Sequence, residues 1–300
     1  MTSAQLQGIG FGLGTAVCQS VYYLFTRRFV LCSGQTPLQL LVVSHVLMGL
    51  FSAVLLLVLR PLWLPSWGDV ALILAGSISY LAGQLALARV LRDESSSRIT
   101  PLLGSKIIVL ALLSALCLQQ HLLPAQWLAV LLSAGAAWLL NESGGRMPAT
   151  LLVLVSAAVL GYCLSDLSVG VILQQLPADG PPRGLLVAAM FYLMSGIVVL
   201  PFVFRREAHV GRIWALALPC ALTWFAAMCL LCACFACIGV VFGNIVQATR
   251  GLIAVVLGWA VARIGFTHLE VHVSRRVFWR RIAGAVLMLL AVALYLCARA

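Results

Sequence analysis

The chain has 300 residues, of which 63% are hydrophobic and 9% charged, whereas a soluble domain is about 45–50% apolar and about a quarter charged. Water therefore cannot be the solvent for most of its surface, which excludes an ordinary soluble protein. The formal net charge of +11 comes from arginines that lie mainly in short gaps between apolar runs, a pattern of membrane-flanking charge that fits a nucleic-acid patch poorly.

Ten apolar runs are long enough to cross a bilayer, whose core of about 30 Å requires about 20 residues of helix. We expect transmembrane helices near residues 6–26, 38–59, 69–91, 99–118, 124–140, 149–176, 184–204, 213–237, 240–264 and 277–298. Turn and charge signals separate most of these runs. The eighth and ninth runs meet at Gly239 almost without a polar linker, and residues 266–281 leave room for a short interfacial helix.

A polar segment from Asn141 to Arg146 divides the chain into two halves of five spans each. Because five is odd, the second half must cross the membrane in the opposite sense to the first, as in many secondary transporters. We therefore predict an all-α integral membrane protein of ten transmembrane helices, built from inverted five-helix repeats over residues 1–141 and 149–300 that form one membrane domain.

Short local matches between the halves support this repeat. Ser105-Lys106 in the fourth span corresponds to Thr249-Arg250 in the ninth, and Cys18-Gln19-Ser20 in the first span corresponds to Cys163-Leu164-Ser165 in the sixth. Each match joins equivalent places in the two halves. The polar residues of one half can therefore be compared with those of the other.

With these features the chain resembles the drug/metabolite transporter superfamily, in its ten-helix EamA-type branch. The resemblance also rests on the fifth-span run from Gln126-Trp127-Leu128 to Gly135 and its echo from Arg281 to Gly284. The chain departs from the family where a glutamate often follows a glycine before the fifth and tenth spans, since Gln119-Gln120 and a basic stretch stand there. The resemblance implies a transporter, and not an enzyme, in the cytoplasmic (inner) membrane.

Ionisable side chains inside a bilayer cost about 2.5–3.5 kcal/mol each on insertion scales, which makes them functional candidates. Lys106, the only lysine, Asp166 and Arg250 fall well inside predicted spans, and Arg250 shares a helix face with Gln247 and Asn244. Two cations at one central cavity would repel unless a carboxylate, a ligand anion or loss of the lysine proton relieved the repulsion.

We expect Lys106 and Arg250 to hold an anionic or zwitterionic substrate, with Asp166 alternating between ion pair and proton carrier. The alternative is a buried Lys106–Asp166 or Arg250–Asp166 pair that only fixes helix packing. The residues alone do not choose between these interpretations.

Polar residues also recur at helical spacing in two other spans, where lipid would leave them unsatisfied. The stripes are Thr15, Gln19, Tyr22, Tyr23 and Thr26 in the first span, and Ser77, Tyr80 and Gln84 in the third. Gln19, Tyr22, Tyr80 and Gln84, with Asn244, Gln247 and Trp224, complete the predicted substrate contacts. The alternative is hydrogen bonding between helices without a substrate role, and His45 and Trp138 are interpreted as structural on that logic.

We predict no metal site and no cofactor. Cys229, Cys232, Cys234 and Cys237 spread over more than half of a helix circumference and are interpreted as packing residues. The sequence has no Walker-type phosphate loop, so we do not expect ATP hydrolysis.

The distribution of basic residues and the family resemblance predict opposite orientations of the chain in the membrane. Outside the spans, most basic residues follow odd-numbered spans, and only Arg60, Arg183 and Arg299 lie on the other side. The positive-inside rule then puts both termini outside, whereas the family resemblance implies both inside.

The predicted function is secondary transport by alternating access, with export of a small polar metabolite such as an amino acid or a carboxylated derivative. A multidrug exporter of hydrophobic cations is the first alternative, although two basic residues at the cavity would repel such cargo. A membrane-embedded enzyme acting on a lipid head group is the second. The expected partners are the small-molecule substrate and membrane lipids; one chain can form its own pathway, so a monomer suffices and a dimer stays open.

Overall fold

The computed structural model describes residues 2–61, 63–93, 103, 105–117, 119, 122–139, 149–177, 180–203, 211–250, 253, 283, 284, 286, 287, 290–295, 297 and 298. Every regular element within these residues is a helix. The helices are α1 (Ser3–Ser33), α2 (Pro37–Leu59), α3 (Trp67–Asp93), α5 (Lys106–Cys117), α6 (Pro124–Leu139), α7 (Ala149–Gln175), α8 (Pro181–Val203), α9 (Gly211–Ile238) and α10 (Val240–Gln247).

The first eight described helices lie at the first eight predicted spans, often to within three residues at each end, and α10 covers the start of the ninth. Of the described helices, α2, α3, α7, α8 and α9 are long and apolar enough to cross a membrane, and α5 and α6 are shorter apolar helices. The chain is therefore a multi-pass helical membrane protein. Most of the predicted ninth span beyond residue 250 and several parts of the predicted tenth lie outside the described residues, so the count of ten spans and the inverted repeat stay predictions.

Local sequence signals set several helix ends. At the start of α1 the Thr2 side chain accepts a hydrogen bond from the Gln5 backbone N–H, while the Gln5 side chain accepts one from the Thr2 N–H. Pro37 occupies the first turn of α2, where its missing N–H costs nothing. Gly239, at φ 83°, separates α9 from α10, as the sequence predicts, because glycine adopts this left-handed conformation without steric cost.

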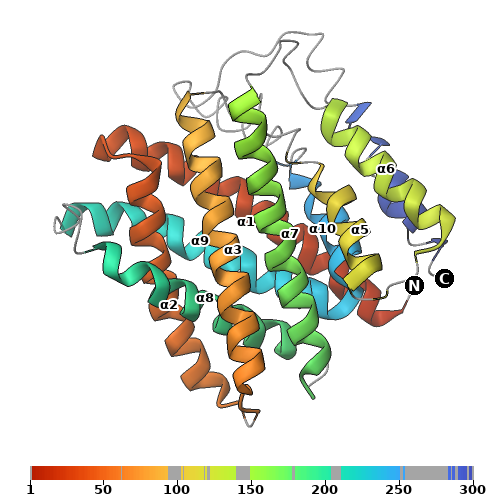
Figure 1. Cartoon of the computed structure of the whole chain (residues 1–300), viewed down its shortest axis with the longest axis horizontal. Coiled ribbons are helices and arrows are strands. Elements are labelled where there is room, and N and C mark those ends of the chain that lie inside the picture. Colours follow the sequence, from red (N-terminus) through yellow and green to blue (C-terminus); the bar gives the residue numbers. More distant parts are fainter. Residues whose placement is uncertain are drawn as a thin grey trace.

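Helices from the two halves of the chain pack against each other in pairs. The most extensive contacts join α1 to α9, α3 to α7 and α2 to α8, and each pair takes one helix from either side of the central polar segment. In Figure 1, α3 and α7 lie side by side, with α5 next to α7. The two halves are therefore interleaved.

Glycines allow two of these pairs to approach closely. A methyl group on Gly196 of α8 would lie 2.8 Å from the Cα of Gly49 on α2, and one on Gly161 of α7 would lie 3.0 Å from the Cα of Gly83 on α3. Small residues at such crossings are typical of membrane helix packing, where van der Waals contact drives association.

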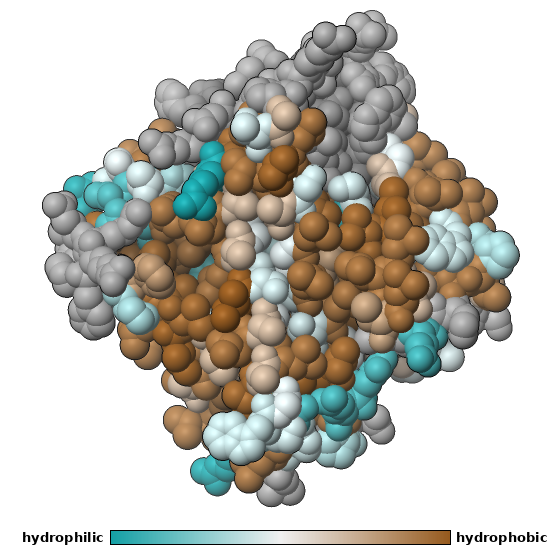
Figure 2. Space-filling view, viewed as in Figure 1, coloured by the Kyte–Doolittle hydropathy of each residue, from teal (hydrophilic) through white to brown (hydrophobic). Residues whose placement is uncertain are grey.

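The outer surface of the helices is apolar. Figure 2 shows hydrophobic residues over the middle of the visible face and hydrophilic residues mainly towards its edges. Leu57 and Val58 of α2, Val153 of α7 and Ile197 of α8 are among the large hydrophobic side chains that point outward. A bilayer would cover such a surface, in agreement with the sequence composition.

Candidate functional site

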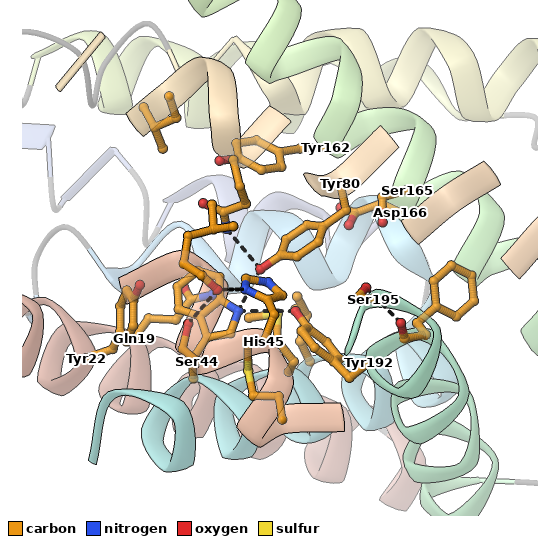
Figure 3. A pocket seen from close by; sticks show the side chains of 18 of the residues that line it. Gln19, Tyr22, Ser44, His45, Tyr80, Tyr162, Ser165, Asp166, Tyr192 and Ser195 are labelled. Carbon is orange, nitrogen blue, oxygen red and sulfur yellow. Dashed lines mark hydrogen bonds between the residues drawn. The ribbon is translucent and has the colours of Figure 1, made fainter. Parts of the chain in front are cut away.

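A cavity of about 210 Å³ lies among the paired helices, and Figure 3 shows the side chains around it. It is lined by residues of α1, α2, α3, α5, α7, α8, α9 and α10 and by Arg250 just beyond α10. The predicted site residues that line it are Gln19, Tyr22, Tyr80, Gln84, Lys106, Asp166, Trp224, Gln247 and Arg250. Asn244 does not line the cavity but contacts Asp166. The structure therefore brings the predicted residues together, while their role in substrate binding stays a prediction.

An ion pair between Lys106 of α5 and Asp166 of α7 lies on the cavity wall. The Lys106 Nζ is 2.7 Å from the Asp166 Oδ2, and the two side chains are 17% and 14% exposed. The Asn244 side-chain amide donates to the same carboxylate oxygen at 2.8 Å. Lys106 Nζ also lies 5.9 Å from the centroid of the Tyr162 ring, one turn before Asp166. Of the two pairings that the sequence left open, the structure contains Lys106–Asp166.

Arg250 supplies a second cation to the cavity. Its Nη1 donates to the Gln19 side-chain oxygen of α1 at 3.2 Å, and its backbone carbonyl accepts from Ser20 Oγ at 3.3 Å. Among the described residues its guanidinium has no carboxylate partner. Lys106, Asp166 and Arg250 are the formally charged residues of the lining, so the cavity carries an excess of one positive charge.

A network of hydrogen-bonded aromatic side chains forms another part of the wall. The Trp224 indole N–H points at two hydroxyls and donates to Tyr80 at 2.8 Å and to Tyr192 at 3.1 Å. The Gln84 amide donates to the same Tyr80 hydroxyl at 2.9 Å. The ring of Tyr22 packs against Trp224 at 4.5 Å between centroids. The network joins α1, α3, α8 and α9, so we expect it to fix the shape of the cavity.

Replacement of Trp224 by phenylalanine should lower the free energy of unfolding by about 1–3 kcal/mol, because two buried hydroxyls lose their shared donor. Thermal unfolding of the purified protein in detergent measures this loss. Trp67→Phe is the matched control, since Trp67 is 90% exposed at the start of α3. An equal effect of both changes would contradict a stabilising role for the network.

Two aromatic lining residues were not named in the sequence analysis, and a third lining residue was interpreted there as structural. Tyr162 and Tyr192 line the cavity, and so does His45, which was interpreted as structural. A signal existed for Tyr162, since it precedes Asp166 by four residues and so shares its helix face. Two residues of the polar stripes make hydrogen bonds between helices. Thr15 donates to the Ala227 carbonyl oxygen of α9, and Ser77 donates to the Phe191 carbonyl oxygen of α8.

Comparison with known proteins gives one family. Residues 6–142 match the model of the EamA-like transporter family. No curated protein matches the chain. A solved structure, described only as the crystal structure of a protein, has a TM-score of 0.69 and 15% sequence identity, and the match covers 100% of this chain and 99% of that one. At this identity the likeness concerns the fold alone.

Proposed function

We propose that the chain is a transporter of the EamA-like family, whose model matches residues 6–142. On this premise it exports a small anionic or zwitterionic metabolite, such as an amino acid or a carboxylated derivative, by alternating access across the cytoplasmic membrane. The observation that carries the proposal is the charged wall formed by Lys106, Asp166 and Arg250.

Charge balance favours a substrate carboxylate. A cation in a protein interior is costly unless an anion pairs with it, and the carboxylate of Asp166 is already held by Lys106 and Asn244. A carboxylate between Arg250 and Lys106 would neutralise the excess charge. If the substrate also carries an ammonium group, Asp166 can accept it in exchange for Lys106, and this exchange would leave Asp166 free to take up or release a proton.

The lining also supports entry from one side of the membrane. It includes Thr26 near the end of α1, Pro37 at the start of α2 and Ala88 near the end of α3. Arg28 lies near the end of α1, and Arg98 follows α3 in the sequence. By the positive-inside rule this side is cytoplasmic, which is where an exporter loads its substrate.

The helix pairs support an inverted repeat over residues 1–141 and 149–300. In such a repeat α1 is equivalent to α7, α2 to α8 and α3 to α9. If each helix is replaced by its equivalent, the α1–α9 contact becomes the α7–α3 contact. The α2–α8 contact is converted into itself. Two interleaved repeats that rock about a central site are the usual basis of alternating access.

Export of hydrophobic cations is the second candidate, because aromatic rings that line a cavity can bind a cation through their faces. Tyr22, Tyr162 and Trp224 supply such rings. The excess positive charge opposes this cargo, since like charges repel.

Thermal stabilisation of the detergent-purified protein by a panel of amino acids, dipeptides, carboxylates, phosphates and organic cations tests the proposal. We expect stabilisation by an acidic or zwitterionic compound that is lost in the Lys106→Ala and Arg250→Ala variants. Arg28→Ala, which removes an exposed arginine near the end of α1, should leave it unchanged. Stabilisation by hydrophobic cations alone, unaffected by either cavity variant, would favour the second candidate.

A further inference from the structure

His45 of α2 lies inside the cavity with an unused polar atom. Its side chain is 4% exposed and its ring lies 5.6 Å from that of Tyr80 and 6.3 Å from that of Tyr192. Figure 3 shows the imidazole among the lining side chains. Among the described residues, its Nε2 has no hydrogen-bond partner. Buried polar atoms are almost always paired, so an unpaired one at a cavity points to a ligand.

The other ring nitrogen defines what Nε2 can do. Nδ1 lies 2.7 Å from the backbone carbonyl oxygen of Leu41, one turn earlier in α2. A carbonyl oxygen can only accept, so Nδ1 carries a proton. In the neutral imidazole Nε2 then carries a lone pair and can only accept.

The surroundings favour this neutral form. An imidazolium in an apolar, aromatic cavity would need an anionic partner. Asp166 is the carboxylate of the described lining, and it is already engaged by Lys106 and Asn244.

Neighbouring hydroxyls do not supply the missing hydrogen. A serine hydroxyl carries one hydrogen, and three nearby serines of the lining direct theirs at backbone carbonyl oxygens. Ser44 donates to Leu41 at 3.2 Å, Ser195 to Phe191 at 2.8 Å and Ser77 to Phe191 at 3.1 Å. Since no donor of the described residues lies within hydrogen-bonding distance of Nε2, a molecule that enters the cavity can supply one.

We infer that Nε2 of His45 accepts a hydrogen bond from an O–H or N–H group on the side group of the transported solute. This inference rests on the proposed function and narrows its substrate class to amino acids or carboxylated derivatives that carry such a donor. The charged wall holds the carboxylate, the rings of Tyr80 and Tyr192 contact the body of the side group, and His45 selects its donor. A solute that displaces a water from Nε2 without replacing its hydrogen bond loses affinity, and this loss is the basis of the selection.

The test compares binding of amino acids that differ in one donor. The pairs are threonine and valine, tyrosine and phenylalanine, and tryptophan and 3-benzothienylalanine, in which sulfur replaces the indole N–H. Quenching of the fluorescence of the purified protein, or thermal stabilisation for the fluorescent probes, gives the affinity. In the wild type we expect the donor-bearing member of at least one pair to bind about 10-fold more tightly.

Variants separate this selection from the charged wall. His45→Phe keeps a ring but no acceptor, and should reduce the affinity ratio to about 1. His45→Gln keeps an acceptor and should retain a preference. Leu50→Met, on the exposed face of α2 and outside the lining, should change nothing. Lys106→Ala should weaken both members of a pair and leave their ratio unchanged.

The outcomes are distinct. Equal binding of both members of every pair in the wild type, or a preference that survives in His45→Phe, overturns the inference while the proposed function stands. If no amino acid binds at all, the proposed substrate class fails, and the inference falls with it.

Discussion

Replacement of Lys106 by methionine is expected to abolish transport and to lower the free energy of unfolding by about 3–5 kcal/mol. The change leaves the Asp166 carboxylate, which is 14% exposed, with the Asn244 amide as its remaining described partner. Solute counterflow in proteoliposomes measures transport, and thermal unfolding in detergent measures stability. Lys106→Met alone does not show whether the ion pair binds substrate or only fixes helix packing, because the protein loses stability in either case when one partner of the pair is removed.

A double variant, Lys106→Met with Asp166→Leu, separates the two interpretations. Replacement of a buried ion pair by apolar residues of similar volume is often neutral or stabilising, so stability should recover in the double variant. Transport should not recover, because the cavity has lost both groups that would bind the substrate charge. A double variant that transports at the wild-type rate would show that the pair only fixes the packing of α5 on α7.

The sequence was informative wherever the bilayer itself imposes a rule. Span length and turn signals located α2 and α6 to within one residue at each end, because a membrane helix must satisfy all its backbone groups over a fixed thickness. The cost of a buried charge singled out Lys106, Asp166 and Arg250, which the structure places on one cavity.

The missed residues share a different property. His45 and Tyr192 lie in predominantly apolar helices. A helical period shows which face of its helix a residue occupies, but not which other helix packs against that face. Their position in the cavity depends on how α2 crosses α8, and that crossing depends on two glycines that are unremarkable in the sequence. For the same reason the partner of Asp166 stayed open between Lys106 and Arg250.

Gly196→Ala should destabilise the protein by about 1–3 kcal/mol or more, although it adds one methyl group. That methyl would lie 2.8 Å from the Gly49 Cα and 3.0 Å from the His45 carbonyl oxygen. Both atoms belong to the backbone of α2, so no side chain can rotate away and the two helices must separate. Separation would also move His45, so we expect weaker substrate binding in whatever protein still folds.

Gly10→Ala is the matched control, since Gly10 lies on the exposed face of α1 with nothing within 4 Å of an added methyl group. Alanine is preferred over glycine in a helix by up to about 1 kcal/mol, so this variant should be as stable as the wild type or slightly more stable. Thermal unfolding of the three proteins in the same detergent gives the comparison. If Gly196→Ala unfolds at the same temperature as Gly10→Ala, the close crossing of α2 and α8 is wrong, and the placement of His45 in the cavity loses its structural basis.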